Sequence, residues 1–511
     1  MAERPNAPVL KTGEVLSLRG FKSHLFRTRG VSSSEGTPPS FGGISEFRHR
    51  TERAFTVLLQ LRNDAADEQK VFTLIGRPPL VGAAPRARLG VGEVLDSVGF
   101  KLFVLAILVS PSALAIGSET SRWSLGFASM NNVVDPVIIA IGLTQLVPIT
   151  RELLPAHLTK LDSRTRQTTV LFAAFVLWAT VAWIVHPRAY GMFLILRLIG
   201  VAGISRLVRN LASAQRRTVT RAFVGVTAFN ALACIGQLAL NRALGLYLLG
   251  ELPYPFMATK EWRVPYGISM YPYAITVTGL LCVALLVVAR NDHIGRWWTV
   301  SGAAGAGIIL GCSGSVSGLA TLVALLASCC IFAGRNGRAW RGLAIVLVPF
   351  LLALGTACVA QRGVWLWKGN RTVSVESGQA TSGRSGQMRV ALKMTSQWPV
   401  TGVGPGGFMR TRLSNPEYDL ITPDRQITHS LPLLVMAELG IPGLGLLVLT
   451  FLRAGVGRMR NTLLLPASLS GYLLADFMHW YRGMGLLQLG VVLGFMLVQR
   501  DPDLVPNLDV R

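Results

Sequence analysis

Long apolar runs recur along most of this chain, with short polar gaps between them. Each run is long enough to cross the roughly 30 Å of hydrocarbon in a bilayer as one helix. About twelve runs meet this requirement, at 98–117, 131–149, 168–186, 190–209, 221–241, 272–289, 298–314, 316–334, 341–360, 430–452, 463–480 and 484–499. Only 15% of the 511 residues are charged, too few for the surface of a water-soluble protein of this size. The sequence therefore predicts an all-α polytopic membrane protein with about twelve transmembrane helices.

Basic residues concentrate in alternate gaps between these runs. The five clusters are Arg151, Lys160, Arg164 and Arg166; Arg206, Arg209, Arg216, Arg217 and Arg221; Arg290 and Arg296; Arg335, Arg338 and Arg341; and Arg453, Arg458 and Arg460. The positive-inside rule assigns these gaps to the cytoplasm, and both termini with them. The net charge is +24, but short clusters between apolar runs favour contact with membrane lipids and argue against a nucleic-acid partner.

The chain divides into three parts on this pattern. Residues 1–95 mix Pro, Gly and Ser with scattered charges, which predicts a largely disordered cytoplasmic extension. Residues 96–500 hold the membrane domain, and residues 501–511 form a short cytoplasmic tail. Between the ninth and tenth runs lies a long extracytoplasmic loop, 361–429. Loops of this length are usually functional, and there is no ATP on that side of the membrane.

The 361–429 loop is expected to be partly helical. A helix is predicted from about Ser385 to Gln397, where Trp398-Pro399 ends it. The side chains predicted to share one face of this helix are Met388, Ala391, Leu392 and Thr395. A glycine-rich turn follows at 402–407. Two interpretations of this turn are equally open: a tight turn, or a place where bare backbone amides approach a phosphate.

Histidine and charged residues near the apolar runs supply the remaining chemistry. His429 lies at the predicted outer mouth of the tenth span, where an imidazole can accept a proton near neutral pH. A histidine at a helix end is ordinarily structural, and Glu438 is expected to orient the start of the same helix. Arg197, inside the fourth span, is predicted to snorkel or to pair within the helix bundle.

Two patterns in the segment from about Ser382 to Leu449 resemble the signature region of the O-antigen ligase / O-antigen polymerase superfamily. The first pattern is carried by Arg384, Pro399, Gly402, Gly404 and Phe408, and the second by His429, Ser430, Gly440 and Gly443. Weaker matches are Gln237, the RVPYGISMYPYA stretch, and Asp476 with His479. Members of this superfamily are bacterial inner-membrane transferases that move undecaprenyl-linked glycans. One departure is Ser317, which stands where an arginine is frequent and slightly favours the polymerase branch over the ligases.

The resemblance implies a membrane glycosyltransferase domain that is inverting and metal-independent and uses no cofactor. Arg384 would hold the donor pyrophosphate, and His429 would act as general base on the acceptor hydroxyl. Further candidates for binding the pyrophosphate or glycan are Arg263, Arg389, Arg410, Arg482 and Gly404. The implied donor is an undecaprenyl-pyrophosphate-linked glycan, the acceptor is a glycan or lipid A-core, and a chain-length regulator is a candidate partner.

A transporter or flippase for a lipid-linked glycan or a polysaccharide, without transferase chemistry, is the main alternative. About twelve spans and charges such as Arg197 and Asp476 within them would suit such a protein. However, transporters commonly contain internal repeats, and the sequence shows none. The interpretation as a transferase of the bacterial inner membrane is therefore favoured.

Overall fold

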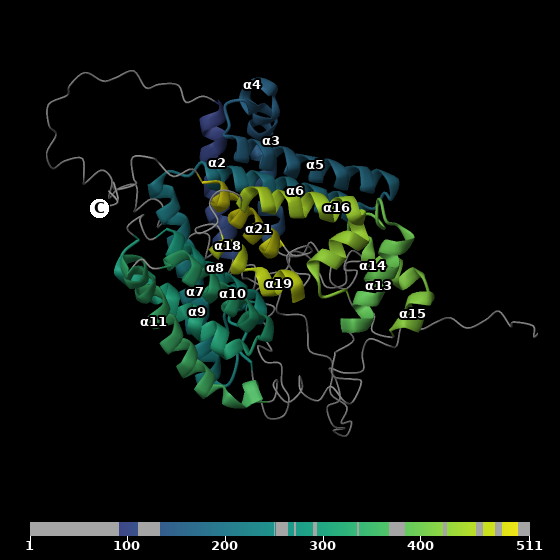
Figure 1. Cartoon of the computed structure of the whole chain (residues 1–511). Helices are drawn as coiled ribbons and strands as arrows, with labels where there is room; N and C mark the ends of the chain where they lie inside the picture. The colour runs from purple at the N-terminus through teal and green to yellow at the C-terminus, as the bar shows by residue number, and fades with distance from the viewer. Residues whose placement is uncertain are drawn as a thin grey trace, which may run out of the picture. The chain divides into compact units, whose positions relative to one another are not determined.

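The structure is a computed structural model that describes residues 91–110, 133–249, 251, 264–269, 272–289, 294–334, 337–366, 384–422, 427–455, 463–475 and 483–498. In these ranges the regular elements are all helical (Figure 1). Their bounds are α2 Val91–Val109, α3 Val134–Leu153, α4 Pro155–Leu158, α5 Ser163–Val185, α6 Ala189–Arg209, α7 Ser213–Leu240, η1 Tyr247–Leu249, α8 Pro272–Val288, α9 Arg296–Ser313, α10 Val316–Ala333, α11 Gly337–Ala360, α13 Arg384–Gln397, α14 Phe408–Ser414, α15 Glu417–Ile421, α16 Leu431–Gly455, α18 Leu464–Ala467, α19 Ser470–Ala475 and α21 Gly483–Leu497.

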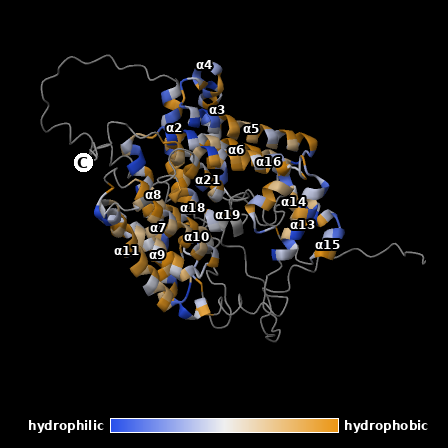
Figure 2. Cartoon of the chain, in the orientation of Figure 1, coloured by the Kyte–Doolittle hydropathy of each residue, from blue (hydrophilic) through white to orange (hydrophobic). Residues whose placement is uncertain are grey.

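Six of the described helices are long and apolar enough to cross a membrane: α3, α5, α6, α7, the Ala339–Ala360 part of α11, and α16. Shorter apolar helices occur in α8, α10 and α21. Apolar side chains run along these helices, whereas α13 and α15 carry more hydrophilic residues (Figure 2). The prediction of an all-α membrane protein is confirmed, while the number of twelve spans stays a prediction.

The run at 463–480 differs from its prediction. In its described part, up to residue 475, it forms two short helices, α18 and α19, instead of one span. The hydroxyl of Ser468 donates to the Leu465 carbonyl oxygen at 2.6 Å, within the turn that separates them. A side chain that binds nearby carbonyls in this way competes with helix continuation, which hydropathy alone does not detect. The α2 helix also begins at Val91, before the expected border at residue 95.

The long helices pack in two groups. In one, α3 and α21 pack on α6, and α16 packs on α5; in the other, α9 packs against α7, α8 and α11. Helix α2 contacts both α3 and α7 and so joins the groups. Small residues allow the close contact of α9 with α11, since a Cβ at Gly307 would overlap the Phe350 carbonyl oxygen.

A buried ion pair joins α3 and α6. The Arg197 guanidinium Nε lies 3.4 Å from Asp135 Oδ1, and its Nη1 lies 3.4 Å from the Tyr190 hydroxyl. Both charged side chains are almost completely buried. The prediction that Arg197 pairs within the bundle is therefore confirmed, which fits the rule that charges inside a membrane domain find partners.

Candidate active site

Helices α13, α14 and α15 gather at one end of α5 and α16, which we call the α13 end of the bundle (Figure 1). The predicted helix at 385–397 is confirmed, as α13 runs from Arg384 to Gln397. Its buried side chains are Gln387, Val390, Ala391, Met394 and Thr395, a regular helical stripe. The predicted face is right for Ala391 and Thr395 but wrong for Leu392, which is 50% exposed. The stripe is rotated because α13 packs against both α16 and α15.

The glycine-rich turn docks into a bend in α16. Helix geometry breaks at Gly440, where φ is 71°, a value that L side chains rarely adopt. Two backbone bonds fix the turn to the bend: Val403 N–H donates to the Ala437 oxygen at 2.9 Å, and Ile441 N–H to the Pro399 oxygen at 2.9 Å. A Cβ at Gly440 would overlap the Val400 carbonyl oxygen. The turn and the bend therefore require glycine for close backbone contact.

Glu438 is hydrogen-bonded to the same glycine-rich turn. Its carboxylate is completely buried and accepts hydrogen bonds from Gly406 N–H at 2.8 Å and Phe408 N–H at 3.0 Å. The amides of Gly402 and Gly407 donate to backbone carbonyls within the segment. These four amides are engaged by the protein, which supports the tight-turn interpretation over a phosphate cradle. Glu438 thus stabilises the turn, a role beyond the expected orientation of its own helix.

Replacing Glu438 with Gln is expected to destabilise the protein by about 1–3 kcal/mol. The amide group of Gln offers one acceptor oxygen and turns an NH₂ donor toward a backbone N–H, leaving a buried donor unsatisfied. The thermal unfolding midpoint in detergent measures the effect. Glu417→Gln is the matched control, because Glu417 is exposed and its pair with Lys393 lies at the surface. Equal midpoints for the two variants would contradict the role of Glu438.

The connection between α5 and α6 also contacts this turn, which sequence reasoning missed. Arg188 Nη1 donates to the Gly407 oxygen at 2.8 Å, and Trp183 Nε1 donates to the Arg188 oxygen at 2.8 Å. His186 Nε2 lies 3.4 Å from Thr401 Oγ1. Partial burial, and secondarily the nearby Arg188 charge, lower the pKa of His186 below its usual range.

The lowered pKa of His186 predicts a dependence of stability on pH. The folded state binds its proton more weakly than the unfolded state, so His186 contributes stability above the unfolded pKa of about 6.5. That contribution is lost as the pH falls through the folded pKa. We expect the unfolding midpoint to fall between pH 7 and pH 5, and to fall less in His186→Gln. An unchanged pH dependence in His186→Gln would contradict this assignment.

His429 and Gln387 are brought together across the loop. His429 Nδ1 lies 2.8 Å from Gln387 Oε1, although the two residues are 42 positions apart. Gln387 is buried, and His429 is partly buried just before α16 begins. Arg384 is exposed and lies one helical turn before Gln387, so both side chains project from the same side of α13. On this spacing we group Arg384 with the Gln387–His429 pair and call the three residues the His429 cluster. Gln387 was missed, and its three-residue spacing from Arg384 was the available signal.

The other predicted binding residues are placed less closely. Arg389 and Arg410 are exposed, and Arg389 stands two positions from Gln387, a spacing that points it away from the His429 cluster. Gly404 is buried with φ 85°, and a Cβ there would come 2.7 Å from His186 Cβ. Arg263 and Arg482 lie outside the described residues. The binding roles of all five stay predictions.

Arg412, two positions after the exposed Arg410, is buried. Its Nη2 donates to the Thr422 oxygen at 2.5 Å, and its Nη1 lies 3.4 Å from Asp419 Oδ1. It therefore links α14 to the end of α15. Among the described residues, no group of three or more His, Cys, Asp or Glu side chains is placed to hold a metal ion.

The fold and this cluster define a polytopic helical membrane protein with a structured helical segment packed on the end of its bundle. Residues 301–448 match a family model described as O-Antigen ligase. The matched segment begins in α9 and ends in α16, and it includes Arg384, Gln387 and His429. The chain therefore carries an O-antigen ligase family domain, and the resemblance to the O-antigen ligase/polymerase superfamily is confirmed. No curated protein and no solved structure matches the chain.

Proposed function

We propose that this protein is a membrane glycosyltransferase of the bacterial inner membrane that uses an undecaprenyl-pyrophosphate-linked glycan as donor. It transfers or polymerises that glycan onto a sugar hydroxyl of a glycan or lipid A-core acceptor. The observation that carries the proposal is the His429 cluster, in which a histidine, its hydrogen-bond partner and an exposed arginine lie within the segment that matches the family.

The contact with Gln387 supports a base role for His429. If the Gln387 oxygen accepts a hydrogen bond from Nδ1–H, the neutral imidazole keeps its lone pair on Nε2. That lone pair takes the proton of the acceptor hydroxyl as its oxygen bonds to the anomeric carbon of the donor. The bond from the anomeric carbon to the pyrophosphate oxygen breaks in the same step, with inversion. No metal is needed in this scheme.

Arg384 suits the leaving group. As the bond to the pyrophosphate breaks, negative charge grows on its oxygens, and a guanidinium binds two such oxygens side by side. Arg384 is exposed at the first turn of α13 and can reach a ligand outside the protein. We place the α13 end at the outer face of the membrane, because the basic clusters lie in the opposite set of gaps. Both termini are then cytoplasmic.

Purified protein tests the proposal. It is incubated in detergent with lipid-linked glycan isolated from the same cells and with free acceptor, in the presence of a chelator. We expect products with more glycan units, or a glycan-acceptor conjugate, together with loss of donor. Donor that binds and is recovered unchanged would contradict the transferase and favour a transporter.

Gln387 is expected to act as a positioning residue. Gln387→Met removes the hydrogen bond that selects the His429 tautomer, and we expect the transfer rate to fall about tenfold, the equivalent of one net hydrogen bond. Gln387→Glu places a carboxylate beside the imidazole and favours its protonated form. The acid limb of the pH–rate profile should therefore move to higher pH in Gln387→Glu. An unmoved limb would show that Gln387 supports only the packing of α13.

A further inference from the structure

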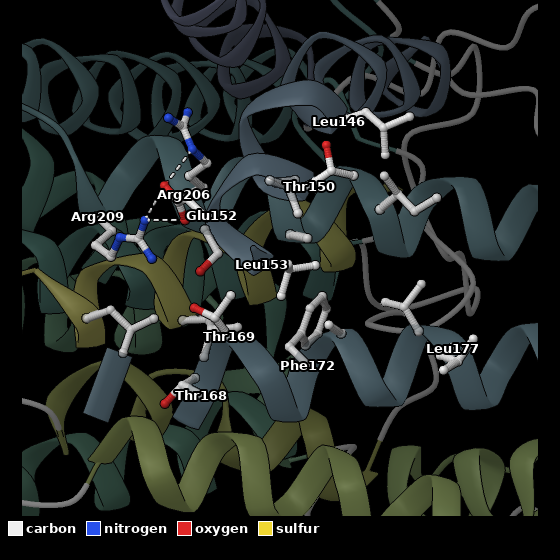
Figure 3. Close-up of a pocket in the computed structure, with 18 of the residues that line it drawn as sticks. Leu146, Thr150, Glu152, Leu153, Thr168, Thr169, Phe172, Leu177, Arg206 and Arg209 are labelled. Atoms are coloured by element: carbon white, nitrogen blue, oxygen red, sulfur yellow. Dashed lines mark hydrogen bonds and ion pairs between the residues drawn. The ribbon is translucent and has the colours of Figure 1, made fainter. Parts of the chain in front are cut away.

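A pocket of about 300 Å³ opens between α3, α5, α6 and α21 (Figure 3). Its lining includes no residue of the His429 cluster. Its walls are mainly apolar, with Leu146, Phe172 and Val176 among them. Leu146 is 40% exposed and Leu177 is 65% exposed, so the pocket has an apolar rim at the outer surface of helices that can span a membrane. Such an opening faces lipid chains in a bilayer. The walls fit a hydrocarbon chain.

One end of the pocket is strongly polar, and we call it the arginine end. Arg206 and Arg209 both bind Glu152 there, at 2.8 Å and 2.7 Å (Figure 3). Arg206 also pairs with Asp96 at 2.6 Å, and Arg164 Nη2 donates to the Met496 oxygen at 2.5 Å, next to the lining residue Leu497. The pocket thus has an apolar body and a charged end.

The arginine end carries excess positive charge. The charged side chains that line this end or contact it are Arg164, Arg206 and Arg209 against Glu152 and Asp96. One net positive charge is therefore left to attract an anionic group. Hydroxyl groups of Thr150, Thr168 and Thr169 add polar contacts at the pocket wall. The charge pattern selects an anionic head group over a neutral one.

The arginine end and the His429 cluster lie at opposite ends of the bundle. Helix α5 runs from Ser163, near the arginine end, to Val185, and His186 directly after it contacts the α13 end. Its 23 residues span about 35 Å. If the pyrophosphate of a lipid-linked donor is bound at Arg384, the anionic group of that donor lies at the α13 end and not at the arginine end of this pocket. The occupant therefore belongs to the other leaflet.

We propose that this pocket binds an anionic glycerophospholipid, with one acyl chain between α3, α5 and α6 and the phosphate at the arginine end. Hydrocarbon contacts alone give little preference in a bilayer, because lipid chains are as apolar as the helix surface. Selectivity therefore comes from the head group, whereas the pocket fixes where the chain lies. This site is independent of the proposed transferase chemistry.

Photolabelling of the full-length protein tests the site. The protein in detergent is mixed with phosphatidylglycerol that carries a diazirine in one acyl chain, illuminated and digested. We expect label on the α5 peptide that contains residues 168–180, and we expect unlabelled phosphatidylglycerol to compete for it. Phosphatidylcholine with the same diazirine chain should label this peptide several-fold less. Equal labelling by the two lipids would overturn the proposal.

Two pairs of variants locate the lipid. Arg209→Gln should weaken phosphatidylglycerol binding about fivefold, which equals about 1 kcal/mol for one basic residue near a membrane surface. Arg217→Gln removes a charge from the same basic cluster, but Arg217 lies in α7 and does not line the pocket, so this variant should bind the lipid as the wild type does. Ala173→Trp fills the chain site and should remove the α5 label, whereas Leu232→Trp on the exposed face of α7 should not.

These outcomes separate the proposal from its competitors. A loss in Arg217→Gln equal to that in Arg209→Gln would indicate general charge attraction and overturn a defined site. Displacement of phosphatidylglycerol by undecaprenyl phosphate at equal concentration would show that the pocket binds the chain of the donor lipid. That result would also overturn the proposal of a glycerophospholipid site. Gel filtration and unfolding midpoints check each variant. Should Ala173→Trp fail to fold, the wild-type labelling pattern with the two lipids still decides the question.

Discussion

The His429→Gln variant is expected to transfer glycan about 10²–10⁴-fold more slowly than the wild type, the range attributed to a positioned general base. The Gln amide can still form hydrogen bonds with Gln387 and with an acceptor hydroxyl, but it cannot take a proton. His429 is only partly buried, so the substitution should leave the fold intact. His429→Ala should be equally inactive.

Initial rates at saturating donor, compared at matched amounts of folded protein, measure this effect. His157→Gln is a suitable control, because it makes the same change in α4, far from the His429 cluster. A transporter would tolerate Gln at position 429 through hydrogen bonding alone. A near-wild-type rate for His429→Gln would show that His429 is a structural or binding residue.

Arg384→Lys is expected to lower the transfer rate by about ten- to a hundredfold although the charge is retained. An ammonium is a point charge and cannot place two parallel N–H groups on a pyrophosphate, and one hydrogen bond to a charged group contributes about 1.5–3 kcal/mol. The position is exposed, so the loss should not come from misfolding.

The comparison uses kcat and KM measured separately with purified lipid-linked glycan. We expect most of the loss in kcat, because the charge on the leaving group is largest in the transition state. Arg362→Lys provides the same chemical change at another exposed position and should have no effect. Wild-type kinetics for Arg384→Lys would show that Arg384 does not bind the pyrophosphate through a bidentate contact.

The membrane helices were largely predictable, because spanning a bilayer requires long apolar runs and hydropathy measures these directly. The C-terminal end of α13 at Gln397 followed from Trp398-Pro399, a local signal. The break between α18 and α19 was not predicted, because hydropathy does not detect local side-chain to backbone bonds such as that of Ser468.

Side-chain partners in the site were harder to predict than helices. Gln387 and His429 are 42 positions apart in the sequence. The turn amides and Glu438 are about 30 positions apart. Only tertiary packing brings each pair together. The family patterns placed Arg384 and His429 in one segment, whereas the only signal for Gln387 was its three-residue spacing from Arg384. Likewise, the glycine pattern fitted two interpretations, and the buried carboxylate of Glu438 decides for the tight turn.

The stoichiometry of a single turnover tests the central claim most directly. Purified protein in excess is mixed with lipid-linked glycan and acceptor, and both products are quantified by mass spectrometry at successive times. We predict that one undecaprenyl pyrophosphate is released for each glycosidic bond formed, at the same rate, and that His429→Gln releases neither while still binding the donor. Donor that remains intact in the wild type, or release that is equally fast in His429→Gln, would contradict the account.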